Sequence, residues 1–266
     1  MKTYQVGGSV RDELLGVEPY DKDWVVVGSS PEEMIEAGFK PIGKDFPVFL
    51  HPDTKEEYAL ARTERKSGKG YHGFKFYYDP SVRLEDDLLR RDLTINAIAK
   101  DSQGKLIDPF NGQDDLFNKK LRNVSDAFCE DPLRAIRLGR FLSYKHISDF
   151  SITPQLKAIV KKILDSGELN YLSGDRVFAE IDKAMRNHFP EKFFNFVVEN
   201  KLDKPWLKDI NSLDSFSASN PDLRWVVKAQ QASQYFVISF CTKHHCMQVR
   251  KPATYCIRME HGRRRK

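Results

Sequence analysis

The sequence predicts an α+β protein in which a small mixed sheet with helices (residues 1–125) precedes a helical region (residues 126–200). In the first region, short β-rich apolar runs alternate with turns that contain glycine and proline. From about Asp126 onward, apolar residues recur at helical spacing instead. The periodicity fades after about Lys201, so we expect residues 201–266 to form a shortened helical or poorly ordered body.

Composition limits the class of protein. Of the 266 residues, 40% are hydrophobic and 30% are charged, which suits one large or two smaller globular domains. No apolar run reaches the ~18–20 residues of a membrane helix, so we expect no membrane span. The net charge of +5 permits a polyanionic partner without demonstrating one. The N-terminus does not read as a secretory signal and four cysteines make no disulfide framework, so we expect a cytoplasmic protein.

The first region is expected to begin with strands separated by tight turns. Four runs of β-forming residues predict strands at 4–6, 24–27, 47–50 and 57–61. Between the first two, Gly7-Gly8 predicts a turn and residues 10–15 a short helix that Gly16 ends. Pro31 is expected to begin another helix. Residues 62–73 are charged and rich in glycine, which predicts a mobile loop.

The second region is expected to contain four helices. They are predicted at 131–144, 153–164, 175–186 and 191–200. Asp131 can cap the first helix with Pro132 in its first turn, and Thr153 opens the second. Arg176 and Glu180 stand four residues apart, and we interpret them as a brace for the neighbouring helix. The alternative is a modest salt bridge within their own helix.

The first group of polar residues that could perform chemistry follows the first strand. Gly7 and Gly8 allow a ligand to approach the backbone closely, and Arg11 adds a fixed cation. Asp21 and Asp23 lie two apart at a strand start, so their side chains point to the same side. Two hard carboxylates beside a phosphate-binding turn suit Mg²⁺ that bridges to substrate phosphates. The alternative is a solvated turn, because a lone Asp-x-Asp pattern is common.

The second group is the segment RRDLTINA (90–97). Its adjacent arginines, Arg90 and Arg91, suit contact with a triphosphate or an RNA backbone. Asp92, Thr94 and Asn96 alternate with apolar residues, so some of them must form hydrogen bonds inside the fold. A surface charge pair before a helix is the alternative interpretation.

The third group is a ridge of charged residues at a spacing of three on the first predicted helix. Its members are Asp131, Arg134, Arg137 and Arg140. Three arginines with one carboxylate leave positive charge without a partner, which favours an anionic ligand. A solvated helix face held by salt bridges is the alternative.

Together these segments resemble the bacterial class II tRNA nucleotidyltransferases, the CCA-adding enzymes of the polymerase-β-like superfamily. Seven segments match in order over roughly residues 1–200: GGSVRDELLG (7–16), DKD (21–23), ARTERKSGKGY (61–71), RRDLTINA (90–97), DPFNG (108–112), EDPLRAIRLGRF (130–141) and RVFAE (176–180). Residues 4–27 and 46–73 look most like the γ-proteobacterial enzymes. The resemblance implies a polymerase-β-like head or palm (1–125), an all-helical, nucleobase-reading neck (126–200) and a truncated body (201–266).

The resemblance also implies an activity and its residues. The chain would add C, C and A to tRNA 3′ ends from CTP and ATP, without a nucleic-acid template, and release pyrophosphate. Asp21 and Asp23 would be the catalytic pair that binds Mg²⁺, and Glu57 a third carboxylate near the metal. The nucleotide would be bound by residues that the matching segments supply: Gly8, Arg11, Arg91, Asp131, Arg134, Arg137 and Arg140. The segment 62–73 would act as the lever that switches the pocket from CTP to ATP.

Hydrogen-bond chemistry independently supports base reading by Asp131 and Arg134. Cytosine and adenine each present an amino donor beside a ring-nitrogen acceptor, which suits a carboxylate and a guanidinium. Guanine and uracil present the reverse pattern and would leave buried polar groups unpaired. Mismatches of this kind discriminate by up to ~10⁴–10⁵.

The end of the chain departs from the long γ-proteobacterial enzymes. Those enzymes continue into a phosphohydrolase domain with a His-Asp motif, which this sequence lacks, so no phosphohydrolase activity is predicted. Cysteines and histidines gather near the end, at Cys241, His244, His245, Cys246 and Cys256, but their spacing fits no standard zinc pattern. Two alternatives to CCA addition stay open. One is a poly(A) polymerase, and the other is a non-catalytic relative that binds RNA or nucleotides.

Overall fold

A seven-stranded mixed sheet forms the first part of the molecule. The computed structural model describes residues 1–42, 47–66, 74–203, 207–208, 237–241 and 246–250. The sheet contains β1 (Lys2–Val6), β2 (Asp23–Val27), β3 (Lys40–Pro41), β4 (Val48–Leu50), β5 (Glu57–Leu60), β8 (Ala99–Lys100) and β9 (Leu106–Ile107). Their order is β3-β4-β5-β2-β1-β8-β9, in which β2 and β5 are parallel and the other neighbours antiparallel. The predicted mixed sheet is therefore confirmed, with longer or additional strands.

The register between β1 and β2 determines where the polar residues of the head meet. Val6 pairs with Asp23, so the Gly7-Gly8 turn leaves β1 beside the point where β2 begins. Asp21 stands just before that point. Segments about fifteen residues apart in sequence therefore lie side by side.

Four short helices accompany the sheet. They are α1 (Gly8–Leu14), α2 (Pro31–Glu36), α3 (Leu84–Leu89) and α4 (Gly112–Phe117). The predicted helices after Gly8 and at Pro31 are confirmed. Ser30 caps α2 in a reciprocal arrangement, because its hydroxyl accepts from the Glu33 backbone N–H and the Glu33 carboxylate accepts from the Ser30 N–H.

The segment expected to be a loop begins as a strand, so that prediction is wrong for its first five residues. β6 (Arg62–Lys66) pairs with β7 (Phe74–Tyr78) in an antiparallel ribbon. Composition alone favoured a loop, since the pattern of charges gave no sign of the partner strand. Residues 67–73 of the predicted lever lie outside the described residues.

The predicted helical region follows. Its α-helices are α5 (Leu133–Leu142), α6 (Pro154–Asp165), α7 (Gly174–Arg186) and α8 (Pro190–Glu199). Shorter elements connect them: the 3₁₀ turns η3 (Asp126–Glu130) and η4 (Glu168–Tyr171), and the strands β10 (Lys120–Leu121) and β11 (Ser151–Ile152). Asp131 caps α5 as expected, because its Oδ1 accepts from the Leu133 backbone N–H at 3.1 Å. Thr153 does the same for the Leu156 N–H at the start of α6.

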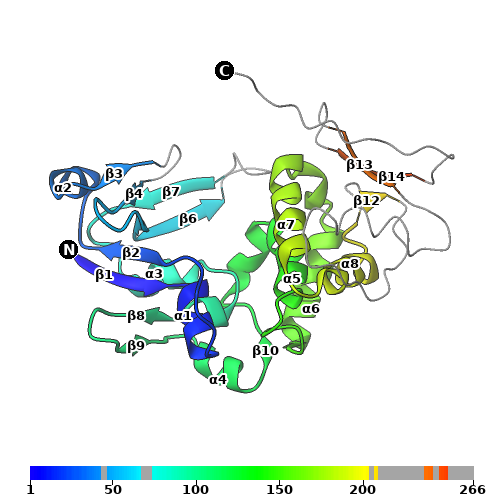
Figure 1. The fold of residues 1–266 in the computed structure, drawn as a ribbon, viewed down its shortest axis with the longest axis horizontal. Coiled ribbons are helices and arrows are strands. Elements are labelled where there is room, and N and C mark those ends of the chain that lie inside the picture. Colours follow the sequence, from blue (N-terminus) through cyan, green and yellow to red (C-terminus); the bar gives the residue numbers. More distant parts are fainter. Residues whose placement is uncertain (43–46, 67–73, 204–206, 209–236, 242–245, 251–266) are drawn as a thin grey trace.

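The sheet and the helices share a hydrophobic core. Val10 from α1 and Leu93 belong to the same buried cluster as Phe128, Ile136 and Phe193 of the helical region. The helices α5 to α8 pack together on one side of the molecule and the sheet lies on the other (Figure 1). The shared core holds the two parts against each other. The predicted boundary at residue 125 between a sheet domain and a helical domain stays a prediction.

Past residue 203, where a shortened helical or poorly ordered body was expected, the described residues form the strands β12 (Leu207–Lys208), β13 (Val237–Cys241) and β14 (Cys246–Arg250). His244, His245 and Cys256 lie outside the described residues.

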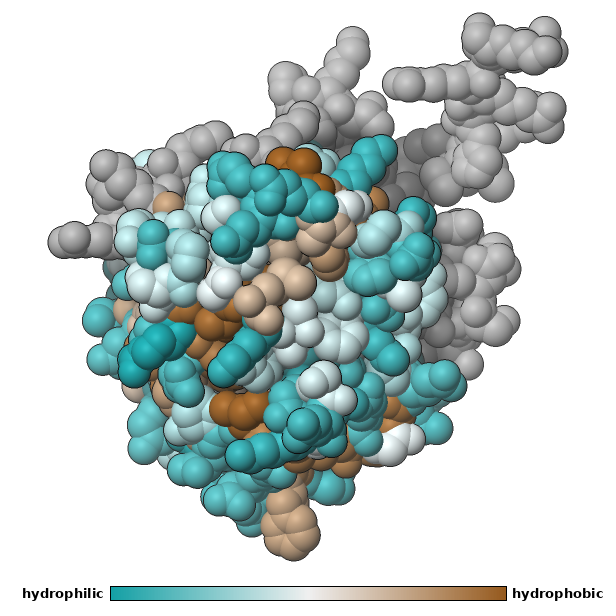
Figure 2. Space-filling view, turned by 90° about the vertical axis from the view of Figure 1, so that its left-hand side faces the viewer, coloured by the Kyte–Doolittle hydropathy of each residue, from teal (hydrophilic) through white to brown (hydrophobic). Residues whose placement is uncertain are grey.

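The outward face of the sheet region is mainly hydrophilic, with small separated apolar patches (Figure 2). None of the described helices is long and apolar enough to cross a membrane.

Candidate active site

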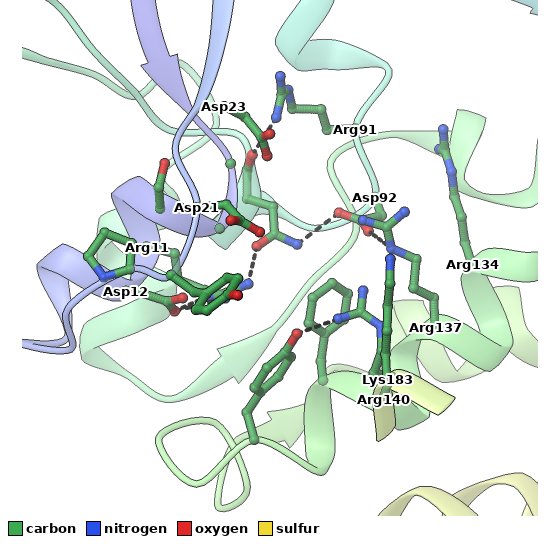
Figure 3. Close-up of a pocket in the computed structure, with 18 of the residues that line it drawn as sticks. Arg11, Asp12, Asp21, Asp23, Arg91, Asp92, Arg134, Arg137, Arg140 and Lys183 are labelled. Atoms are coloured by element: carbon green, nitrogen blue, oxygen red, sulfur yellow. Dashed lines mark hydrogen bonds and ion pairs between the residues drawn. The ribbon is translucent and has the colours of Figure 1, made fainter. Parts of the chain in front are cut away.

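A cavity of about 1030 Å³ lies between the sheet and the helical region. The predicted catalytic pair and all of the predicted nucleotide-binding residues line it: Gly8, Arg11, Asp21, Asp23, Arg91, Asp131, Arg134, Arg137 and Arg140. Figure 3 shows Asp21 and Asp23 across the cavity from Arg137, Arg140 and Lys183. The fold therefore gathers segments that are more than 100 residues apart in sequence into one site.

The glycine turn brings two arginines close to the backbone. Gly7 has a positive φ of 75°, and a Cβ there would lie 3.0 Å from Nη1 of Arg91. A Cβ on Gly8 would lie 3.3 Å from Nη2 of Arg11. A Cβ at either position would require the guanidinium group to shift by a few tenths of an ångström, so the double glycine serves both the turn and the site.

The two aspartates form the acidic part of the site. Burial raises the pKa of Asp23, as does the charge of Asp21, although Arg91 lowers it in part. A buried carboxylate whose ionisation is opposed in this way is stabilised by a bound cation, and Mg²⁺ commonly uses one or two carboxylates plus substrate phosphates. The donor set therefore fits Mg²⁺. Glu57 pairs with Asp23 in the β2–β5 register but is not one of the described residues that line the cavity.

Arg11 is fixed from both parts of the molecule and is only 3% exposed. Its Nη1 donates to Asn96 Oδ1 at 2.7 Å and its Nε to Asp12 Oδ1 at 2.8 Å. The guanidinium lies 5.5 Å from the centre of the Tyr144 ring, which follows α5. His146 Nε2 lies 2.9 Å from the same Asp12 oxygen. The helical region thus positions an arginine of the head directly through Tyr144 and indirectly through His146.

Arg90 and Arg91 share the buried carboxylate of Asp87. Nη2 of Arg91 lies 3.2 Å from Asp87 Oδ2, while Arg90 donates to Asp87 Oδ1 and, at 2.8 Å, to Glu64 Oε1 on β6. Burial alone would raise the pKa of Asp87, but the charges of Arg90 and Arg91 hold it below its usual value. Arg90 thereby connects the β6–β7 ribbon to the segment that carries Arg91.

The polar residues of the RRDLTINA segment form hydrogen bonds inside the fold, as predicted. Asp92 Oδ1 accepts from the Leu93 backbone N–H at 2.8 Å and from Asn96 Nδ2 at 2.9 Å. Thr94 donates to Asp115 at 2.6 Å. Burial opposes ionisation of Asp92, yet the Arg137 charge and the Asn96 hydrogen bond lower its pKa to about 2.

The arginines of the α5 ridge have partners from other elements, which corrects the expectation of unpaired positive charge. Nε of Arg137 lies 3.1 Å from Asp92 Oδ2. Arg140 pairs with Glu180 on α7 and donates to the Tyr144 hydroxyl at 2.6 Å. The sequence could not show the two carboxylate partners, because they are 40 or more residues distant. The ridge is therefore a prearranged set of cations.

Asp131, the acidic member of the ridge, and its neighbour Arg134 also line the cavity and also have partners. Nη2 of Arg176 donates to Asp131 Oδ2 at 2.7 Å. Arg134 donates to the backbone carbonyls of Ala127 at 3.0 Å and Arg90 at 2.7 Å. Arg176 thus pairs with Asp131, while Glu180 pairs with Arg140. The predicted brace exists, but it joins α7 to α5 through two separate ion pairs.

Sequence reasoning missed several residues that line the cavity. Tyr144 and Glu64 belong to it, as does Lys183 on α7. Lys183 follows Arg176 by seven positions and Glu180 by three, so helical spacing could have placed it on the same face. Glu64 could not be found in this way, because the segment around it was interpreted as a loop.

Comparisons with known proteins agree with this geometry. Residues 3–122 match the family described as Poly A polymerase head domain. The chain is 57% identical over 199 residues to the CCA-adding enzyme of Marinobacter nauticus, covering 75% of this chain and 53% of that protein. It is also 57% identical over 213 residues to the multifunctional CCA protein of Acinetobacter baumannii, covering 80% of this chain and 52% of that protein.

Solved structures extend the agreement to the helical region. The CCA-adding enzyme of Bacillus stearothermophilus in complex with CTP aligns with a TM-score of 0.65 and 27% identity, covering 79% of this chain and 51% of that one. The Thermotoga maritima enzyme complexed with tRNA_CCA aligns with a TM-score of 0.60 and 29% identity, covering 76% and 47%. The resemblance to CCA-adding enzymes is confirmed. The chain spans about half the length of the relatives that it matches.

Proposed function

We propose that this chain adds C, C and A to the 3′ end of tRNA, taking them from CTP and ATP without a nucleic-acid template. The observation that carries this proposal is the gathering of the predicted catalytic pair and all seven predicted nucleotide-binding residues in one cavity. The likeness to proteins named CCA-adding enzymes supports it. Because those relatives are about twice as long, activity, substrates and tRNA binding are proposed here for this chain itself.

Asp21 and Asp23 would hold Mg²⁺, in keeping with a polymerase-β-like head. When bound, the metal activates the attacking hydroxyl and stabilises the leaving pyrophosphate. Gly8, Arg11 and Arg91 bind the phosphates and sugar of the incoming nucleotide. The tRNA 3′-hydroxyl attacks the α-phosphate, and pyrophosphate leaves.

The arginines are suited to this role because protein groups already hold them in place. Arg11 is fixed by Asp12, Asn96 and Tyr144, and Arg140 by Glu180 and Tyr144. Cations held in advance stabilise developing charge without reorganising during the reaction. Arg137 contacts Asp92 through Nε, and among the described residues its two terminal nitrogens have no hydrogen-bond partner, so they are available for the nucleotide.

Asp131 and Arg134 read the base. Each already has protein partners, namely Arg176 for the carboxylate and two carbonyls for the guanidinium. A carboxylate offers about four acceptor sites and a guanidinium five N–H groups, so both retain capacity for a base. The existing bonds fix the orientation of the reading pair and thereby support selection of C and A over G and U.

The β6–β7 ribbon supplies a route for switching between CTP and ATP. Glu64 on β6 bonds to Arg90 and lies 3.9 Å from Arg134. A movement of the ribbon would therefore reach the base-reading arginine through one carboxylate. This contact supports a lever role for residues 62–73.

Poly(A) polymerase activity is the second candidate, because residues 3–122 match a Poly A polymerase head domain. A catalytic role of either kind is tested by incubating the purified chain with Mg²⁺, labelled ATP or CTP and tRNA that lacks its 3′ end. We expect incorporation by the wild type and none by Asp21→Ala or Asp23→Ala. Incorporation that persists in both variants would refute the assignment. RNA binding with no incorporation by the wild type would identify a non-catalytic relative.

A further inference from the structure

Lys183 is a cation of the cavity that the proposed reaction has not yet used. It lies on α7, on the face that also carries Glu180, and its side chain is exposed at the cavity. Figure 3 shows it reaching into the same space as Arg137 and Arg140. An ammonium group there adds a positive charge that faces the two aspartates.

Its position along the cavity follows from the contacts between α5 and α7. The two helices run in the same direction, because Asp131 pairs with Arg176 near their starts and Arg140 with Glu180 further along. At their ends, Asn187 donates to Ser143 Oγ at 2.7 Å. Lys183 therefore lies between the second contact and the third.

This position is remote from the base-reading pair. Seven residues of α-helix separate Lys183 from Arg176, which is about 10 Å along the axis at ~1.5 Å per residue. Arg11 lies over the Phe141 and Tyr144 rings, which belong to the same end of α5. Lys183 is thus at the phosphate end of the cavity, and its charge also acts on Asp23.

Lys183 differs from the arginines around it in its partners. Arg11, Arg91, Arg137 and Arg140 each have a carboxylate partner. For Lys183, no hydrogen bond or ion pair occurs within the described part of the chain. Binding of an anion by Lys183 therefore breaks no existing pair, and a lysine ammonium is a common phosphate ligand.

We propose that Lys183 binds the β- and γ-phosphates of the incoming nucleotide, and so also the pyrophosphate that leaves. This inference rests on the proposed function, since it uses the same site. It assigns to the helical region a direct contact with the triphosphate, in addition to the contact with the base. The helical region would then contact both the base and the terminal phosphates of the nucleotide.

The test is calorimetric binding of CTP, CDP and CMP to the full chain in the presence of Mg²⁺. Lys183→Ala should weaken CTP binding about tenfold, in the range expected for one charged hydrogen bond, and leave CMP binding unchanged. Lys183→Arg should restore most of the affinity for CTP. Lys162→Ala is the matched control, because Lys162 is an exposed lysine on α6 outside the cavity, and should bind like the wild type.

Two other results would overturn this proposal, and a third would overturn the proposed function. Equal losses for CTP and CMP would overturn the proposal, because the residue would then act on the shared part of the nucleotide or on the fold. Unchanged nucleotide binding with a raised KM for tRNA would also overturn it and assign Lys183 to the RNA backbone. If the wild type binds neither CTP nor ATP, the proposed function itself fails, which is distinct from a failure confined to the variant.

Discussion

Asp92 gives a quantitative test of the electrostatic design of the site. Its carboxylate is 7% exposed, accepts hydrogen bonds from Leu93 and Asn96, and lies beside Arg137. These contacts lower its pKa from the ordinary 3.8 to about 2. We consider the substitution Asp92→Asn, which keeps the shape of the side chain and removes its titration.

The magnitude follows from the shift in pKa. A difference of roughly two units corresponds to about 2–3 kcal/mol of stability at neutral pH, at ~1.36 kcal/mol per unit. Because the folded pKa is the lower one, this stability is present above the unfolded value and is lost as pH falls through the folded value. About half should be lost by roughly pH 3, and most of the remainder by about pH 2.

The assay is urea unfolding of the wild type and Asp92→Asn at a series of pH values between 7 and 2. The stability advantage of the wild type should be constant above pH 5 and shrink below it. Asp165→Asn is the control, since that carboxylate is 58% exposed and forms a surface pair with Lys161. An advantage of Asp92 that stays constant down to pH 2 would refute the reasoning, as would an equal pH dependence in the control.

Three further predictions concern selectivity, packing and the link between the two parts of the molecule. Arg134→Ala should relax the choice among the four nucleoside triphosphates in an incorporation assay, whereas equal losses with all four would contradict its base-reading role. Gly112→Ala should destabilise the fold by about 1–3 kcal/mol in urea unfolding, because a Cβ there would lie 2.3 Å from the Thr94 carbonyl oxygen. His146→Ala should raise the KM for CTP a few-fold with little change in kcat, since it removes the bond that orients Asp12 beside Arg11; a KM that equals the wild-type value would argue against this link.

Local sequence patterns predicted the elements that build the site. The strand–Gly-Gly–helix sequence, the strand after Asp21 and the helices around Arg134 and Arg176 all depend on nearby residues, and all were found. The site residues were predicted by resemblance and lie in one cavity. Their individual roles remain predictions.

Features that depend on distant contacts were not predictable in this way. The β6 strand requires its partner β7, and its charged residues gave no local sign of pairing. The partners of Arg137 and Arg140 are 45 and 40 residues away in sequence, so the ridge seemed to carry unpaired charge. Strands such as β8 contain two residues, too few to show a period.

The most direct measurement of the central claim is the sequence of the product made from tRNA that lacks its 3′ end. The purified chain, Mg²⁺ and the tRNA would be supplied with each nucleotide singly and in pairs, and the products separated at single-nucleotide resolution. We predict two additions with CTP alone and, with CTP and ATP together, two C residues followed by a single A. Long runs of A would contradict CCA addition and identify a poly(A) polymerase, and a wild-type protein that binds CTP but extends no tRNA would contradict catalysis by this chain.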